Sequence, residues 1–420
     1  MLKKTAMFFL TTYLFFLFMD FTSSDEIFPH FVYVLLKPYV AFWDWMVSWT
    51  GSHILRMDHP ITIKPNGSGD TTYNYVMQLC WIVLALMIAI LWAVLDRRRP
   101  GYSRLYYWVR VITRYYFAYV LFTYGFVKII KLQFPFPGLN TLTETYGNSS
   151  PMKLAWTFIG YSNGYNLFTG GAEVLAGVLL FFKRTTLLGS LIALTIMINV
   201  FAINMAYDIP VKIFSLNLIF LAIFLAAHDF SRLRAMFFLN TTAPPAQLNT
   251  PAPRRRNMIL QRSLKGLYVV LALYFTLGIA MKSREEYGEL APKPPLYGIY
   301  DVEQFTLQGT PLPPLTTDTA RWKRMIISYP GSASLSNMAD SLRYLSLKID
   351  TVKKTALFTS YKDSTDTWTM AYSLPDKEHL LFTGSIRKDS VTISMRRFDL
   401  NKFQLVNRGF HWINEYPFNR

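Results

Sequence analysis

Cysteine and histidine are scarce in this chain of 420 residues, and their scarcity excludes several kinds of redox centre. Cys80 is the single cysteine, whereas a resident dithiol, an iron–sulfur cluster or a cysteine zinc site needs at least two thiolates. The six histidines lie outside the apolar segments or at an edge of one, which disfavours a haem held between helices by a buried imidazole. We therefore expect no bound metal or cofactor. A redox role would use the metal of a partner protein or a diffusible lipid quinone.

Acidic residues are also few, with 26 Asp and Glu against 43 Lys and Arg, a net charge of +17. Residues 1–281 carry 24 basic and 11 acidic residues (net +13), and residues 282–420 carry 19 and 15 (net +4). The basic residues sit in short loops and not along one soluble face, so we expect no nucleic-acid partner. They are typical of loops that stay in the cytoplasm and contact anionic lipid headgroups.

Long apolar runs are missing from residues 282–420, whereas the first 281 residues contain seven. An apolar helix of about 20 residues spans the hydrocarbon core of a bilayer and satisfies its own backbone groups there. The first run also has the shape of the apolar part of a cleaved signal peptide, and both interpretations place residue 22 outside. The predicted spans are 5–21, 75–95, 107–130, 166–182, 186–206, 211–228 and 259–281.

The distribution of Lys and Arg predicts the orientation of these spans. With the N-terminus in the cytoplasm, inside segments hold sixteen basic residues and the longer outside segments hold seven. We therefore expect a multi-pass protein of the cytoplasmic (inner) membrane, with the bilayer as its first partner and its C-terminal part extracytoplasmic. The expected segments are 1–106 with two spans and an outer interfacial aromatic helix at 27–49, a four-helix core at 107–230, a cytoplasmic linker at 231–258, the last span at 259–281, and a β-rich domain at 282–420.

The C-terminal segment changes to a periodicity of two residues, which predicts half-buried strands. Residues 367–374 and 390–395 alternate polar and large apolar side chains, and 387–389 reads as a turn after a strand at 379–386. Residues 334–345 are interpreted as a short helix. Strands about ten residues apart are typical of a small antiparallel barrel or sandwich. The predicted fold class is thus a mainly α transmembrane bundle of about seven spans with a C-terminal extracytoplasmic antiparallel β domain.

Polar and charged side chains occur within or beside four of the predicted spans, where they are costly and usually find partners. Lys128 with Glu173, and Lys212 with Asp208, are expected to pair because they fall at similar depth in the outer half of the membrane. One interpretation is that these pairs only fix helix register. The other is an outward-facing polar pocket for a headgroup, a quinone carbonyl or a small polar solute. The candidate pocket residues are Arg114, Tyr124, Lys128, Glu173, Asn199, Asn204, Asp208, Lys212 and Asn217.

Three stretches in the core resemble DoxX-like membrane proteins. The sequence from Arg114 to Tyr119, leading to Gly125 and Lys128, is similar to the opening helix of that family, 171–184 to the second helix, and 204–208 to the end of the third. The resemblance covers about residues 107–230 and implies a four-helix core. DoxX-like and DoxD-like proteins are bacterial and archaeal membrane subunits, some of them associated with quinone-linked oxidation of sulfur compounds or with oxidative-stress complexes. The resemblance therefore implies a non-catalytic or quinone-associated subunit of an oxidoreductase.

Three functional hypotheses follow, since no nucleophile–base set, phosphate-binding loop or metal-ligand spacing stands out. The first is a redox-associated subunit that binds quinone through Lys128, Glu173, Asp208 and Lys212. The second is a scaffold whose outer β domain recruits a membrane or extracytoplasmic protein through the aromatic stretch 407–415, although Phe410 and Trp412 would ordinarily close the core of the sheet. The third is a small-solute transporter. The sequence specifies neither substrate nor oligomeric state.

Overall fold

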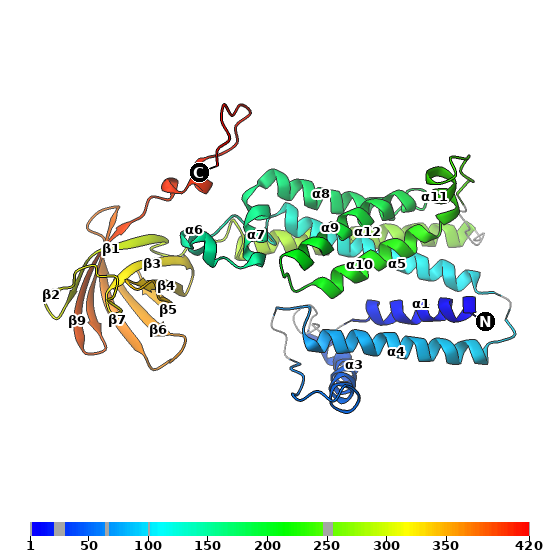
Figure 1. Ribbon diagram of the computed structural model, residues 1–420, viewed down its shortest axis with the longest axis horizontal. Coiled ribbons are helices and arrows are strands. Elements are labelled where there is room, and N and C mark those ends of the chain that lie inside the picture. The colour runs from blue at the N-terminus through cyan, green and yellow to red at the C-terminus, as the bar shows by residue number, and fades with distance from the viewer. Residues whose placement is uncertain (1, 21–29, 64–66, 100, 247–254, 420) are drawn as a thin grey trace. The chain divides into compact units, whose positions relative to one another are not determined.

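The computed structural model describes residues 2–20, 30–63, 67–99, 101–246 and 255–419. The chain divides into two compact units (Figure 1). The first, called the helical unit, comprises Met1–Gln133, Pro151–Ala155 and Gly164–Lys282, and the second, called the barrel unit, comprises Phe134–Ser150, Trp156–Asn163 and Ser283–Arg420. Two short segments that sequence analysis placed in the 107–230 core thus belong to the barrel unit.

The helical unit contains ten helical segments among its described residues. Three of them supply helices that are long and apolar enough to cross a membrane: Thr72–Leu95, Thr186–Ala206 and the part of α12 at Met258–Glu286. A fourth span results if α10 and α11, which meet at 80°, are counted as one broken segment. The segments are α1 (Leu2–Phe18), α3 (His30–Trp49), the π-helical turn η1 (Thr50–Ile54), α4 (Thr72–Leu95), α5 (Ser103–Ile129), α8 (Asn163–Leu180), α9 (Thr186–Ala206), α10 (Lys212–Ala227), α11 (Phe230–Phe237) and α12 (Arg255–Glu286).

Small side chains set how closely these helices approach one another. Ala85, Ala89 and Ala93 recur every four residues along one face of α4 and are almost fully buried. The ring of Phe8 on α1 stacks on Trp92 with ring centroids 4.2 Å apart, so α1 packs along this face of α4. The other faces of α4 expose large apolar side chains such as Leu91. Exposure on this scale is normal for a helix that faces lipid and abnormal for one that faces water.

The predicted aromatic helix is present as α3, although residues 27–29 of the predicted segment lie outside the described part of the chain. Trp43 is buried and packs edge-to-face on Trp81 of α4, whereas Phe42, Trp45 and Trp49 are exposed. This division of aromatic residues between a packed face and an open face is the pattern of an interfacial helix. The membrane position itself remains a prediction. Of the predicted linker 231–258, residues 231–237 belong to α11, residues 255–258 belong to α12, and 247–254 lie outside the described residues.

The barrel unit is built around one antiparallel sheet (Figure 1). Strand β1 pairs with both β3 and β9, so β1 and β3–β9 close into an eight-stranded up-and-down barrel, and the short β2 extends the sheet beside β1. The strands are β1 (Gly298–Leu307), β2 (Thr310–Pro311), β3 (Trp322–Tyr329), β4 (Ser332–Asn337), β5 (Leu342–Asp350), β6 (Thr355–Ser360), β7 (Thr367–Ser373), β8 (His379–Ile386) and β9 (Asp389–Arg397). The unit also holds α6 (Leu139–Thr143), η2 (Tyr146–Asn148), most of α7 (Pro151–Tyr161), η3 (Leu400–Lys402) and α13 (Gln404–Asn407).

Alternation of side chains fills the middle of the barrel. Met370, Leu380, Phe358, Phe382 and Ile393 point inward and are fully buried, as expected for an eight-stranded barrel whose interior is just wide enough for side chains. The predicted strands at 367–374, 379–386 and 390–395 are confirmed.

Two sequence-based interpretations of the barrel unit are wrong. Residues 334–345 form the end of β4, a turn and the start of β5. Ala333 and Leu335 both face inward on β4, and Asn337 accepts a hydrogen bond from the Ser341 backbone N–H (2.9 Å) to close the turn. Phe410 and Trp412 do not complete the core, since they are 77% and 91% exposed.

Candidate functional site

The predicted pair of Lys128 and Glu173 lies where α5 crosses α8. Gly125 and Gly170 meet at this crossing so closely that a Cβ on Gly170 would stand 2.5 Å from the carbonyl oxygen of Gly125. One turn further along each helix, Lys128 Nζ donates to Glu173 Oε1 at 2.5 Å, and both side chains are buried. The ammonium group also lies 5.8 Å from the centre of the Tyr124 ring. The structure therefore confirms this ion pair and places Tyr124 beside it.

The second predicted pair is also formed, but in a different environment. Lys212 Nζ lies 3.0 Å from Asp208 Oδ1, and the Asp208 side chain is 87% exposed. Asp70, which sequence analysis did not select, accepts hydrogen bonds from the backbone N–H groups of Lys212 (2.7 Å) and Ile213 (3.0 Å). It thus caps the first turn of α10, where an acidic group is favoured. Its signal in the sequence was weak, because the carboxylate lies 142 residues from its partner.

The three predicted asparagines have separate surroundings. Asn204 joins α9 to α10 through a hydrogen bond to Ser215 Oγ (3.0 Å), and Asn199 is exposed. Asn217 accepts a hydrogen bond from the Tyr13 hydroxyl and donates to Gln78 Oε1 (3.2 Å), which links α10 to α1 and α4. Of the nine candidates, the structure therefore brings together Lys128, Glu173 and Tyr124 at one place and Asp208 with Lys212 at another.

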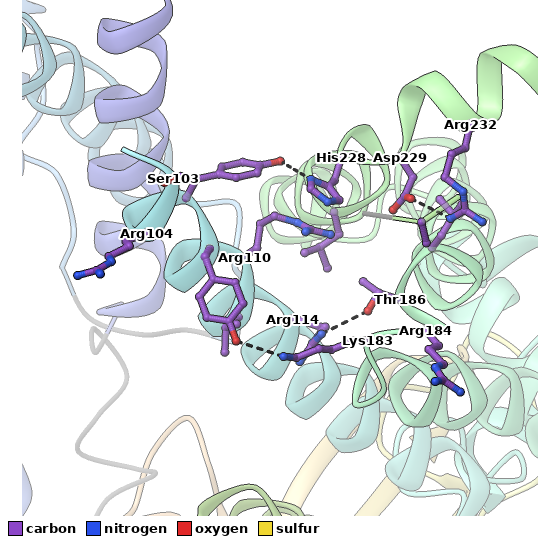
Figure 2. A pocket seen from close by; sticks show the side chains of 16 residues that line it. Ser103, Arg104, Arg110, Arg114, Lys183, Arg184, Thr186, His228, Asp229 and Arg232 are labelled. Atoms are coloured by element: carbon purple, nitrogen blue, oxygen red, sulfur yellow. Dashed lines mark hydrogen bonds and ion pairs between the residues drawn. The ribbon is translucent and has the colours of Figure 1, made fainter. Parts of the chain in front are cut away.

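The ninth candidate, Arg114, belongs to a basic pocket that sequence analysis did not identify as a site. The pocket has a volume of about 640 Å³ and lies in the helical unit between the first half of α5, the α8–α9 turn and the α10–α11 junction (Figure 2). Figure 2 shows Arg110 and Arg114 of α5 extending toward the other two elements, whereas Arg104 points away from them. Its charged lining consists of Arg104, Arg110, Arg114, Lys183, Arg184, Arg232 and Asp229, with His228 beside them.

Helical spacing brings the α5 residues to one face. Tyr106, Arg110 and Arg114 follow each other at intervals of four residues, so they line the same side of the helix. The Tyr106 hydroxyl lies 3.4 Å from His228 Nδ1, and Arg114 Nη1 donates to Thr186 Oγ1, the first residue of α9, at 3.4 Å. These contacts connect α5 to the start of α9 and to the end of α10, and neither involves a carboxylate.

A second set of contacts fixes the cations at the pocket edge. Lys183 Nζ donates to the Tyr107 hydroxyl at 3.3 Å and lies 5.5 Å from the centre of that ring. Arg232 pairs with Asp229 at 2.8 Å. Asp229 is the only carboxylate among the described lining residues, so this pair uses the one internal counter-charge that they provide.

The other cations of the pocket have no carboxylate partner in the part of the chain that the structure describes. Arg114 is only 8% exposed, and Nε of both Arg114 and Arg110 is buried without a hydrogen-bond acceptor among the described residues. Buried charges in proteins are normally paired, because transfer of an unpaired charge from water is very unfavourable. Nε of Arg232 is likewise buried without an acceptor among these residues. A cavity lined by several cations, three of which retain free donors, is chemically suited to an anion with several acceptor oxygens, such as a phosphate or a carboxylate.

Comparison with known proteins identifies a relative without an assigned role. The chain is 36% identical over 124 residues to "Uncharacterized protein YwoB" of Bacillus subtilis (strain 168), a match that covers 30% of this chain and 79% of YwoB. No model of a known protein family matches the chain. No solved structure matches it either.

Proposed function

Because the chain belongs to the same family as the uncharacterized protein YwoB, and this membership brings no activity with it, we propose a function from the basic pocket. The chain is a polytopic membrane protein that binds the anionic headgroup of a membrane lipid in this pocket, at the cytoplasmic face. The observation that carries the proposal is the buried Arg114 guanidinium, which has a neutral hydroxyl partner and, among the described residues, neither an acceptor for its Nε nor a carboxylate. An anionic headgroup supplies both the missing charge and the missing acceptors.

The membrane setting supports a lipid as the source of that anion. The helical unit exposes large apolar side chains on several helices, and three helices are long and apolar enough to span the bilayer. The excess of Lys and Arg in the segments that include this pocket favours the cytoplasmic side, where anionic lipids concentrate. In this proposal the seven-span topology holds, with the N-terminus inside and the β domain outside.

The test measures retained lipid in purified protein. The chain is extracted in mild detergent from a membrane that contains phosphatidylglycerol and phosphatidylcholine, and bound lipid is identified by native mass spectrometry. We expect phosphatidylglycerol to be retained by the unchanged protein and largely lost from the Arg110→Gln, Arg114→Gln double variant. Each charge-assisted hydrogen bond contributes about 1.5 kcal/mol or more, which is at least about tenfold in affinity per arginine.

Two controls make the result specific. Arg262→Gln removes an exposed arginine of α12 that does not line the pocket, and we expect it to leave lipid retention unchanged. Competition with inorganic phosphate separates a lipid site from a site for a free anion, because phosphate that displaces the lipid completely at low concentration points to a soluble ligand. Equal retention of phosphatidylglycerol by the double variant and the unchanged protein contradicts the proposal.

A second candidate function, quinone binding in support of a redox partner, is favoured by one observation at the α5–α8 crossing. Glu173 Oε2 is buried and has no hydrogen-bond donor among the described residues, while Oε1 is held by Lys128. A quinol hydroxyl could donate to Oε2, and the lysine ammonium would stabilise a carbonyl oxygen that gains negative charge on reduction. This is the role that the DoxX-like resemblance implies.

Quinone content of the purified protein tests this second candidate. We expect quinone to be extracted in stoichiometric amount from the unchanged protein and to fall at least about tenfold with Glu173→Gln, which keeps the shape of the side chain and removes its charge. Asp58→Asn changes an exposed carboxylate that belongs to no proposed site and should leave quinone content unaltered. A quinone-free unchanged protein would rule out a resident quinone at this place.

A scaffold role is favoured by the exposed aromatic side chains near the C-terminus. Phe410, Trp412, Ile413 and Tyr416 are each more than three-quarters exposed, which is unusual for a stretch of large apolar residues unless another surface covers it. Affinity capture with the unchanged protein and with Trp412→Ser tests this role. Loss of a specific extracytoplasmic partner is expected, and an unchanged set of partners would reject it.

A further inference from the structure

The open end of the barrel has a pocket of its own. It has a volume of about 260 Å³ and lies where β1 and β8 end and where β5, β7 and β9 begin. Its walls include Trp322, Trp368 and Ile386, and its rim includes Arg343 and Arg387. The interior beyond it is filled by fully buried side chains, so the cavity is confined to this mouth.

Strand alternation determines which rim residues face inward. Arg343 lies two residues before the buried Leu345 on β5, and Trp368 lies two residues before the fully buried Met370 on β7. Because every second side chain of a strand points to the same face, Arg343 and Trp368 belong to the inner face of the barrel. The barrel core beneath these two positions is apolar, so packing alone does not require an arginine or an indole N–H at either of them.

Two donor side chains at this mouth lack an acceptor among the described residues. The Trp368 indole stacks on Phe358 (ring centroids 5.5 Å apart), and its Nε1 is buried without a hydrogen-bond partner among the described residues. Trp N–H groups usually find a partner when they are buried. Within the described part of the chain the structure gives Arg343 no ion pair, whereas Arg387 is held by Asp366 (3.3 Å). The cation of Arg343 is therefore available at the edge of a cavity that is lined by two tryptophans on one part and by Arg387, Asp366 and Asp389 on another.

We propose that the barrel mouth is a binding site for a small amphipathic carboxylate with an aromatic or short aliphatic body. The apolar body lies against Trp322, Trp368 and Ile386. The carboxylate pairs with Arg343 at the rim, and an acceptor oxygen receives the hydrogen of Trp368 Nε1. The cavity is slightly smaller than the usual pocket for a drug-sized molecule. It is too small for a long-chain lipid and suits a ligand of about a dozen non-hydrogen atoms. This site shares no lining residue with the basic pocket of the helical unit.

Isothermal titration calorimetry with naphthalene carboxylate tests the proposal. The full chain is held in nanodiscs of phosphatidylcholine, and the heat measured with empty nanodiscs is subtracted. We expect saturable binding that weakens about tenfold with Arg343→Gln, because a charge-assisted contact is lost. Trp368→Phe keeps the aromatic stacking and removes only the N–H donor, so a several-fold weakening is expected.

Matched controls separate this site from the rest of the chain. Arg396→Gln removes an arginine of β9 that pairs with Glu378 and does not line the pocket, and Arg110→Gln alters the basic pocket of the helical unit. Both should bind naphthalene carboxylate with unchanged affinity. The proposal is overturned if the unchanged protein does not bind, if Arg343→Gln binds equally well, if Arg110→Gln abolishes binding, or if the neutral naphthalene methanol binds as tightly as the carboxylate.

Discussion

Removal of one member of the buried Lys128–Glu173 pair should destabilise the helical unit far more than removal of both. At a separation of 2.5 Å the attraction of two unit charges is about 7 kcal/mol for an effective dielectric constant of about 20. The desolvation of both groups offsets most of this attraction in the intact pair. A single replacement leaves the other charge buried beside apolar helices, and we expect Lys128→Met or Glu173→Leu to lower the free energy of unfolding by about 3 to 5 kcal/mol each.

The double variant should recover most of that loss, because no buried charge remains and the new side chains are apolar. Its free energy of unfolding should lie within about 1 to 2 kcal/mol of the unchanged protein. The assay is reversible unfolding by dodecyl sulfate in mixed micelles, followed by circular dichroism, with Lys37→Met on the exposed face of α3 as a control that should have almost no effect. Single variants that each lose less than about 1 kcal/mol, and whose effects simply add, would refute a desolvated pair.

Three further outcomes are expected. Gly170→Ala should destabilise the helical unit by about 1 to 3 kcal/mol, since its Cβ would lie 2.5 Å from a backbone oxygen of α5, whereas Gly171→Ala meets no atom within 4 Å and should be neutral or stabilising in the same dodecyl sulfate titration. Trp322→Ala should lower barrel stability by about 3 to 5 kcal/mol and Trp412→Ala by less than about 0.5 kcal/mol, as measured by thermal melts of the full chain; equal effects would place the C-terminal aromatic residues in the core after all. Hydrogen bonds from the His379 side chain and from backbone N–H groups lower the pKa of Asp376. The ionised Asp376 therefore stabilises the fold fully above the ordinary carboxyl range near pH 4, and this stabilisation disappears as the pH falls through the lower folded-state pKa. Asp376→Asn should flatten the acid-side loss of melting temperature, and an unchanged pH profile would count against the contact.

Local periodicity was sufficient to predict most of the secondary structure. The strand at 379–386 has the same bounds as β8, because its alternation and the turn after it are both encoded within a few residues. The error at 334–345 has a local cause as well. Its Ser, Asn and Asp residues suit a turn as readily as a helix terminus. The turn is selected by the pairing of β4 with β5, the strands that come before and after it in the sequence.

The candidate site could be predicted only in part, because depth along a helix does not determine the direction of a side chain. Lys128 and Glu173 meet as expected, since the glycines that precede them bring their helices together. Asn199 lies on the same helix as the buried Asn204 and has the same side chain, but it lies on the exposed face of α9. Asn217 was selected without its partners Tyr13 and Gln78, which lie on α1 and α4, far away in the sequence.

The basic pocket was missed for a related reason. Its cations occur in the first half of α5, just after α8 and on α11, in segments where the positive-inside rule already accounts for Lys and Arg in the sequence. To orient the spans, Lys and Arg need only remain on one side of the membrane, and side chains that are exposed to water meet this requirement fully. Burial of Arg114, with no acceptor for its Nε among the described residues, exceeds that requirement, because a solvated arginine would serve orientation equally well without the desolvation penalty. This burial is the observation that favours the proposed ligand site over a purely topological role. The substitution Arg114→Lys keeps the positive charge but loses the planar fork of donors, so it should preserve membrane orientation while it weakens lipid retention.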